Sequence, residues 1–173
     1  MKKIFILFVF LFFVCCLLPG RALEAQLLTF LENPLLNKQA PDFTLPTLSG
    51  QPTSLSQLRD GKSAILFFWA TWCPHCRVQL KELSVMKADI EVKGIKVLLV
   101  DVGESSQQVG NYMKKNNINY EVFLDEDSKV SDEYNLIGVP TYFLIGADGV
   151  IKAVDHAIPS DYVEILTVDP KEG

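Results

Sequence analysis

An apolar segment that runs directly into two closely spaced cysteines is the feature that most constrains how this chain can fold. The sequence SAILFFWA, residues 63–70, is rich in apolar and aromatic side chains, which predicts a strand buried on both faces of a sheet. After TWCPHC, apolar residues follow at helical spacing at Cys76, Leu80 and Leu83. Proline is favoured in the first turn of a helix, so Pro74 marks its start. The cysteines are therefore predicted at the junction between a central strand and a helix.

The segments around this junction predict an α/β domain. The expected elements are a pair of short strands around Ser49-Gly50, a helical turn at 56–59, strands at 95–103 and 120–125, helices at 105–117 and 126–136, a hairpin at 141–154 and a closing helix at 159–166. Strands that alternate with helices and end in a hairpin indicate a mixed central sheet. In open sheets of this kind, chemistry collects at the carboxyl ends of the strands, where the cysteines are predicted.

The first 22 residues have the layout of a secretory signal. Two lysines precede an uninterrupted apolar run of 15 residues, 4–18, and Gly20 and Ala22 offer the small side chains that a signal peptidase reads. The run is shorter than the roughly 20 residues of a full membrane span, although an uncleaved N-terminal anchor remains an alternative. A lipoprotein signal would acylate Cys15 or Cys16, but neither follows the small residue that such a signal requires.

The chain therefore divides into four parts. They are a signal or anchor at 1–22, a linker or stalk at 23–38, the folded domain at 39–168 and a tail at 169–173. The first part holds three of the 16 basic residues and none of the 21 acidic ones, which leaves the rest with a net charge of −8. Such an acidic chain has no basic stripe for nucleic acid, so we expect no nucleic-acid partner.

Beyond the apolar leader, the chain has only two cysteines, Cys73 and Cys76. A small exported domain held together by disulfides would show about four to eight. A bridge that closes so short a loop restrains the unfolded chain little, so it would stabilise the fold weakly. The pair is therefore predicted to be reactive rather than architectural.

The start of the helix makes Cys73 the candidate nucleophile. Unpaired backbone N–H groups and the helix dipole stabilise a thiolate there, and such positions lower a thiol pKa from about 8.5 to between about 3.5 and 7.5. We expect Cys73 at the exposed edge, and Cys76, one turn further in, buried and able to resolve a mixed disulfide. His75 either adds positive charge near the Cys73 sulfur, which would raise the reduction potential, or is a solvated bystander. Trp72 either forms a docking face beside the pair or packs in the core.

A second motif, GVPTYFL, lies far along the chain. Val139 precedes Pro140 at the start of an apolar strand, where a trans proline would interrupt the ladder of hydrogen bonds. A cis bond there would be an uncommon and specific feature. The residues themselves leave cis and trans open.

Three segments together resemble the thioredoxin-like superfamily: APDFTLPTLSGQPTSLSQL, FFWATWCPHC and GVPTYFLIGADGVI. More narrowly, residues 39–166 resemble the TlpA/ResA-type, membrane-tethered thiol–disulfide oxidoreductases of bacteria. Residues 98–127 resemble the extra helix and strand that separate this branch from plain thioredoxins. The resemblance implies a thioredoxin-like fold with a mixed central sheet flanked by helices, an N-terminal β-hairpin and this helix–strand insert.

The same resemblance implies the site and its partners. It makes Cys73 the attacking and Cys76 the resolving cysteine, and it needs neither a cofactor nor a metal. Substrate contacts are implied for Trp72, Val139, Pro140 (in a cis bond facing the pair) and Thr141. Such proteins mostly reduce disulfides outside the cytoplasm, notably in apocytochrome c before haem attachment. Their electrons usually come from a membrane partner of the CcdA/DsbD kind, and an uncleaved N-terminus would hold the protein at the membrane.

Three positions depart from the family pattern. Phe67 stands six residues before the first cysteine, where thioredoxins carry a buried acid, and Gln79 stands three after the second, where ResA-like proteins carry a glutamate. Pro74-His75 resembles the oxidising DsbA type, so a disulfide-introducing oxidase is an alternative function. The other acids that are near in sequence are placed by no motif: Glu82, Asp101 and Asp125.

Three further functions fit the residues less well. A peroxidase of the peroxiredoxin kind needs Pro seven and Thr or Ser three residues before its cysteine, where this chain has Leu66 and Ala70. A copper metallochaperone on this fold uses cysteines three residues apart with a distant histidine, whereas here the gap is two and His156 is the only histidine besides His75. Two thiolates and one histidine also leave a four-ligand zinc site incomplete. A non-catalytic binding module would leave the thiol pair unexplained.

Overall fold

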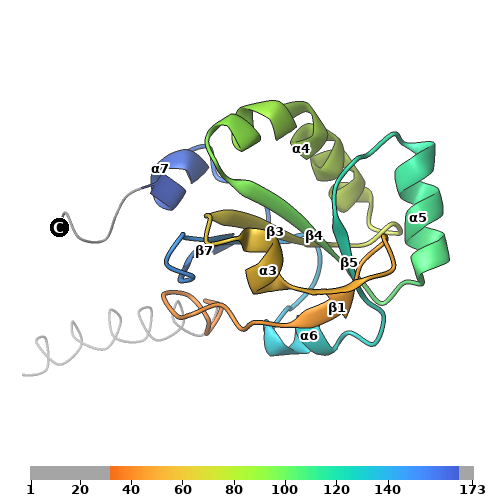
Figure 1. Ribbon diagram of the computed structural model, residues 1–173, viewed down its shortest axis with the longest axis horizontal. Coiled ribbons are helices and arrows are strands. Elements are labelled where there is room, and N and C mark those ends of the chain that lie inside the picture. Colours follow the sequence, from red (N-terminus) through yellow and green to blue (C-terminus); the bar gives the residue numbers. More distant parts are fainter. Residues whose placement is uncertain (1–31, 168–173) are drawn as a thin grey trace, which may run out of the picture. The chain divides into compact units, whose positions relative to one another are not determined.

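A five-stranded mixed sheet forms the centre of the computed structural model, which describes residues 32–167 (Figure 1). Its strands, in spatial order, are β5 (Val122–Asp125), β4 (Lys96–Val102), β3 (Ala64–Trp69), β6 (Thr141–Ile145) and β7 (Ile151–Asp155). The first three run parallel, whereas β6 is antiparallel to β3 and β7 is antiparallel to β6. The predicted α/β fold with a mixed central sheet is therefore confirmed.

The central strand β3 is buried along its whole length, as its apolar sequence predicts. Its side chains alternate between two cores. Ile65, Phe67 and Trp69 face the core that is closed by α4 (Pro74–Val92), α5 (Ser106–Lys115) and α7 (Tyr162–Thr167). Figure 1 shows α4 and α7 on this side of the sheet, and α3, α6 and β1 on the other.

The other face of the sheet is covered by the N-terminal hairpin and two short helices. β1 (Thr44–Pro46) pairs antiparallel with β2 (Pro52–Ser54), and α3 (Leu55–Arg59) follows directly. A capping box between Ser54 and Gln57 satisfies the first backbone donors of α3. α6 (Lys129–Glu133) occupies less of the chain than the helix expected at 126–136. The predicted hairpin is thus present and closes this core.

The predicted helix–strand insert is also present, as α5 and β5. Ser105 caps α5, and its side-chain oxygen accepts the backbone N–H of Gln108. β5 then adds in parallel to β4 at one edge of the sheet. The insert therefore adds a strand beside β4 and a helix on the face of the sheet that α4 covers.

The compact unit begins at Asn33, earlier than the boundary expected at Gln39. The Asn33 side chain donates to the carbonyl of Tyr134, and the backbone N–H of Asn37 donates to that of Ile151. These hydrogen bonds attach residues 33–38 to the domain, and the division of the chain at Gln39 stays a prediction.

The predicted signal or anchor at 1–22, the linker as far as residue 31, and the tail lie outside the described residues. Among residues 32–167, no helix combines the length and the apolar character needed to cross a membrane.

Candidate active site

Cys73 is the N-cap of α4, at the junction predicted from the sequence. Its sulfur accepts the backbone N–H of Cys76 at 3.1 Å, and Pro74 occupies the first turn. A thiolate at this place would be stabilised by the same N–H group and by the positive end of the helix dipole. The local geometry therefore favours Cys73 as the sulfur that carries charge.

The two cysteines form a disulfide in this structure, with Cα atoms 5.2 Å apart. Cys76 is fully buried, as expected for the inner cysteine. Cys73 is only 4% exposed, so the expectation of an exposed edge position was wrong. The reason is a cover from a distant segment, because the sulfur of Cys73 lies 3.7 Å from the carbonyl oxygen of Val139.

The covering segment contains the peptide bond that the sequence left open. The bond between Val139 and Pro140 is cis, as the resemblance implies, and both residues are half-buried. The hydroxyl of Thr141 donates to the carbonyl of Gly138 at 2.8 Å, and its side chain is 3% exposed. Thr141 therefore supports this loop from inside, and its contact with substrate stays a prediction.

His156 and Gln79 connect this loop to the helix of the cysteines. One ring nitrogen of His156, Nδ1, lies 2.8 Å from the carbonyl oxygen of Pro140. The side-chain amide of Gln79, on α4, donates to the backbone carbonyl of His156 at 2.9 Å. Sequence reasoning considered His156 only as a metal ligand and Gln79 only as a missing acid. Together they brace the loop that covers Cys73.

The exposed side chains near the pair are apolar and aromatic as well as polar. Trp72 is 64% exposed, which excludes core packing for it, and Ile137 in the loop before Val139 is 90% exposed. His75 is exposed in the first turn of α4, next to Cys76. Its influence on the Cys73 sulfur stays a prediction.

Where thioredoxins carry a buried acid, Phe67 stacks on Tyr142. Their ring centroids are 4.2 Å apart with an interplanar angle of 6°, and the two residues are register partners on β3 and β6. Burial raises the pKa of Tyr142 well above its ordinary value. This position therefore supplies packing and no ionised group.

Two carboxyl groups nevertheless lie close to the loop between β3 and the cysteines. Asp101 is fully buried near the end of β4, as the register partner of Trp69. Burial, followed by the charge of Glu104, raises the pKa of Asp101 to about 8. Glu104 accepts the backbone N–H of Thr71 at 2.5 Å and its hydroxyl at 2.6 Å. The sequence did not single out Glu104, although its place after a strand beside β3 was a usable signal.

The other two acids that the sequence left unplaced have different surroundings. Asp125, at the end of β5, is buried and accepts the backbone N–H groups of Val130 and Ser131 and the hydroxyl of Ser131. Glu82 is exposed and lines a cavity of about 190 Å³ with Gln79 and other residues between α4 and the segment before α7. Neither contacts the loop of the cysteines as Glu104 does.

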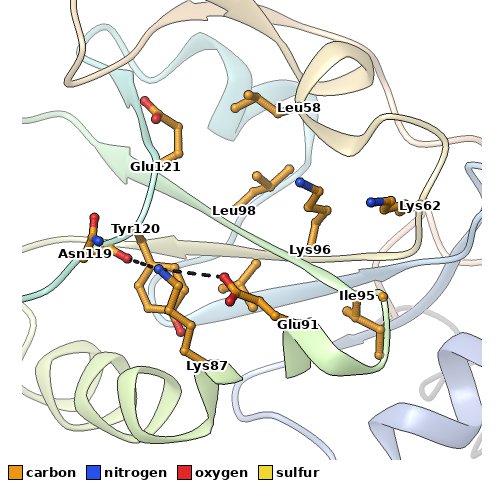
Figure 2. A pocket seen from close by; sticks show the side chains of 12 residues that line it. Leu58, Lys62, Lys87, Glu91, Ile95, Lys96, Leu98, Asn119, Tyr120 and Glu121 are labelled. Carbon is orange, nitrogen blue, oxygen red and sulfur yellow. Dashed lines mark hydrogen bonds and ion pairs between the residues drawn. The ribbon is translucent and has the colours of Figure 1, made fainter. Parts of the chain in front are cut away.

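A larger pocket, of about 400 Å³, lies at the other end of the sheet (Figure 2). Lys96, the first residue of β4, lines it, whereas the cysteines follow the last residue of β3. In Figure 2, Lys87 reaches between Glu91 and Asn119, and its ammonium group lies 4.8 Å from the ring centroid of Tyr120. Residues 32–167 gather no group of three or more His, Cys, Asp or Glu side chains suited to a metal ion. The candidate site is thus the cysteine pair and its surroundings.

Comparison with known proteins agrees with this geometry. The model of the AhpC/TSA family matches residues 36–154. The chain is 34% identical over 139 residues to the thiol-disulfide oxidoreductase ResA of Bacillus subtilis (strain 168), covering 78% of this chain and 77% of that one. It is 30% identical over 167 residues to a ResA of Bacillus cereus, covering 96% and 95%.

Solved structures give the same picture. A putative thiol:disulfide interchange protein DsbE from Chlorobium tepidum superposes with a TM-score of 0.65 at 29% identity, over 73% of this chain and 89% of that one. StoA from Bacillus subtilis superposes with a TM-score of 0.61 at 24% identity, over 73% and 96%. At 24% identity, the similarity to StoA shows only that the fold is shared.

Proposed function

The chain belongs to the AhpC/TSA family and, within it, to the ResA-type thiol–disulfide oxidoreductases, and we propose that it exchanges disulfides with protein substrates through Cys73 and Cys76. The observation that carries this proposal is the position of Cys73 at the start of α4, where its sulfur accepts the Cys76 N–H at 3.1 Å. Cys76 is fully buried, so a substrate sulfur reaches Cys73 first.

The exchange proceeds in two displacement steps. In the reduced protein, the Cys73 thiolate attacks one sulfur of a substrate disulfide, a mixed disulfide forms, and the other substrate sulfur leaves as a thiolate. The Cys76 thiolate then attacks the Cys73 sulfur and releases the second substrate thiolate. The substrate gains two electrons, and the protein is left with the Cys73–Cys76 disulfide seen here. Oxidase turnover runs the same steps backward.

An incoming chain would meet two features beside Cys73. The half-buried loop at Val139 offers backbone groups to an extended peptide, in the manner of an added strand. The exposed indole of Trp72 offers an apolar surface next to the sulfur. A substrate cysteine flanked by apolar residues in an extended segment would suit both features.

We base the proposed location on the N-terminal sequence. The basic and apolar residues of 1–22 have the layout of an export signal or anchor, which would deliver the domain outside the cytoplasm. There, apocytochrome c is a candidate substrate and a membrane protein of the CcdA/DsbD kind is a candidate electron donor. In this role the protein acts as a reductant.

Substitution of each cysteine tests the proposed mechanism. Cys73→Ala is expected to abolish reduction of insulin disulfides, whereas Cys76→Ala is expected to trap mixed disulfides that are visible on non-reducing gels. Turnover that persists in Cys76→Ala would contradict a two-cysteine mechanism.

The reduction potential tests the direction of electron flow. A value near about −270 mV against glutathione would support a reductant, and one near about −120 mV would make it an oxidase. His75→Pro is expected to lower the potential by about tens of millivolts if His75 stabilises the reduced pair. An unchanged potential would make His75 a bystander.

A further inference from the structure

Asp101 is a buried ionisable group that the disulfide-exchange steps leave unused. Its side chain is fully buried near the end of β4, and neither of its oxygens has a hydrogen bond of normal geometry with any of residues 32–167. A buried carboxylate that no donor reaches at normal hydrogen-bond geometry is unfavourable by several kcal/mol, so such a group holds a proton instead. The surroundings of Asp101 therefore favour its neutral form.

The neighbour of Asp101 has the opposite surroundings. Glu104 is 5% exposed and accepts three donors: the backbone N–H of Thr71, the hydroxyl of Thr71 and the side-chain amide of Gln108. After burial, the charge of Glu104 and the proximity of its side chain raise the pKa of Asp101, whereas the backbone N–H of Glu104 partly offsets this rise. These contacts make Glu104 the acceptor of the pair, and they make Asp101 the carboxyl group that has a proton to donate.

Thr71 connects this pair to the reacting sulfur. It lies between the end of β3 and Cys73, and both its backbone N–H and its hydroxyl are bound to Glu104. The Cys73 N–H in turn donates to the carbonyl of Ala70 at 3.2 Å. The position of the loop that delivers Cys73 to the start of α4 therefore depends on Glu104 staying in place.

We propose that Asp101 is a positioning residue of the active site, which holds a proton and shares it with Glu104 so that Glu104 keeps the loop of Thr71 and Cys73 in place. Loss of this proton puts two negative charges side by side in a buried space. Their repulsion weakens the bonds from Glu104 to Thr71, and the added charge disfavours the nearby thiolate. The reactivity of Cys73 thus depends on the ionisation of the Asp101 carboxyl group in addition to that of its own thiol. The inference rests on the proposed function only in taking Cys73 as the reacting sulfur.

The other groups around Asp101 do not supply this ionisation. Asp125, on β5, adds negative charge that raises the pKa of Asp101. Tyr112, on α5, lies against the ring of Trp69 with centroids 5.6 Å apart, and burial raises its pKa above the ordinary value. The charge of Arg77, on α4, lowers the pKa of Tyr112, but by less than burial raises it. A change in the reactivity of Cys73 near pH 8 therefore comes from the pair of Asp101 and Glu104 or from the cysteines themselves.

The rate of alkylation of Cys73 separates these two sources. The full chain, purified in detergent and reduced, is treated with iodoacetamide across the neutral and alkaline range, and modification of Cys73 is followed by mass spectrometry. Asp101→Asn keeps the shape and still donates an N–H to Glu104, but it cannot ionise. Glu121→Gln, an exposed site at the far pocket, is the matched control. We expect the wild-type and control profiles to contain a step near pH 8 that Asp101→Asn lacks.

A second measurement needs no variant. The infrared band of a protonated carboxyl group is expected in the wild-type chain at neutral pH and is expected to disappear as the pH passes about 8. Absence of this band at neutral pH, or superimposable alkylation profiles for wild type and Asp101→Asn, would overturn the proposal. Both readouts are independent of protein substrates, so failure to reduce insulin would count against the proposed function and leave this inference standing.

Discussion

Asp101 and Asp125 are two buried aspartates at the ends of neighbouring parallel strands, yet their surroundings differ. Three donors from the start of α6 reach the carboxylate of Asp125, at 2.6 to 3.1 Å. Among residues 32–167, no donor reaches the carboxyl group of Asp101 at normal hydrogen-bond geometry, and it faces Glu104 instead. The first arrangement holds a helix in place, whereas the second stores a proton under the loop of the cysteines. Burial of an acid therefore does not by itself indicate function. The hydrogen-bond donors around the acid distinguish a structural role from a functional one.

Removal of Asp125 is expected to have the largest effect on stability. Asp125→Ala leaves the buried N–H groups of Val130 and Ser131 without an acceptor, so the free energy of unfolding should fall by about 3 kcal/mol. Urea denaturation at neutral pH measures this loss. Alkylation of Cys73 in the folded fraction should keep its wild-type pH profile, and a changed profile would break the distinction between the two aspartates.

Asp101 is expected to make stability depend on pH. Its pKa is raised from 3.8 to about 8 in the folded protein, so the folded state binds this proton more tightly than the unfolded state. The contribution is fully present below the unfolded pKa and is lost as the pH rises through about 8. The free energy of unfolding should therefore fall between those values by about a few kcal/mol, and Asp101→Asn should flatten the curve.

Urea denaturation at several pH values tests this slope. The Asp101→Asn curve is subtracted from the wild-type curve of the free energy of unfolding against pH. A difference that rises over the same pH range would have the wrong sign for a buried neutral carboxyl group.

The smallest effects are expected from a matched pair of hydroxyl groups. Thr71 donates its hydroxyl to Glu104, and Ser131 donates its hydroxyl to Asp125, both at 2.6 Å. Thr71→Val and Ser131→Ala should each lower the free energy of unfolding by about 1 kcal/mol. Only Thr71→Val should also change the rate of alkylation of Cys73. Equal alkylation rates in the two variants would mean that the Glu104 contact has no influence on the sulfur.

Local patterns predicted much of the fold and the place of the cysteines. The apolar run of β3 required burial on both faces, and Pro74 after Cys73 fixed where α4 begins. Both features depend on residues that are neighbours in sequence. This is why the reactive junction could be located from the sequence.

What the sequence could not give depends on distant contacts. The cover of Cys73 comes from Val139, and the partners of Asp101 and Glu104 come from separate strands and loops. The sequence shows that Phe67 occupies a position where thioredoxins carry an acid. Its stacking on Tyr142, however, depends on the register of β3 and β6. Such pairings are set by tertiary packing, which no local spacing encodes.

The cover of Cys73 also has a consequence for the order in which the chain is made. Synthesis begins at the N-terminus, so Cys73 exists 66 residues before the carbonyl of Val139 that shields it. The brace from His156 arrives 16 residues after Pro140, later still. A chain that is cut short before β6 would therefore carry a complete Cys-Pro-His-Cys motif with an unshielded sulfur. The shield over this sulfur and its brace are therefore complete only after residues 139–156 have been made.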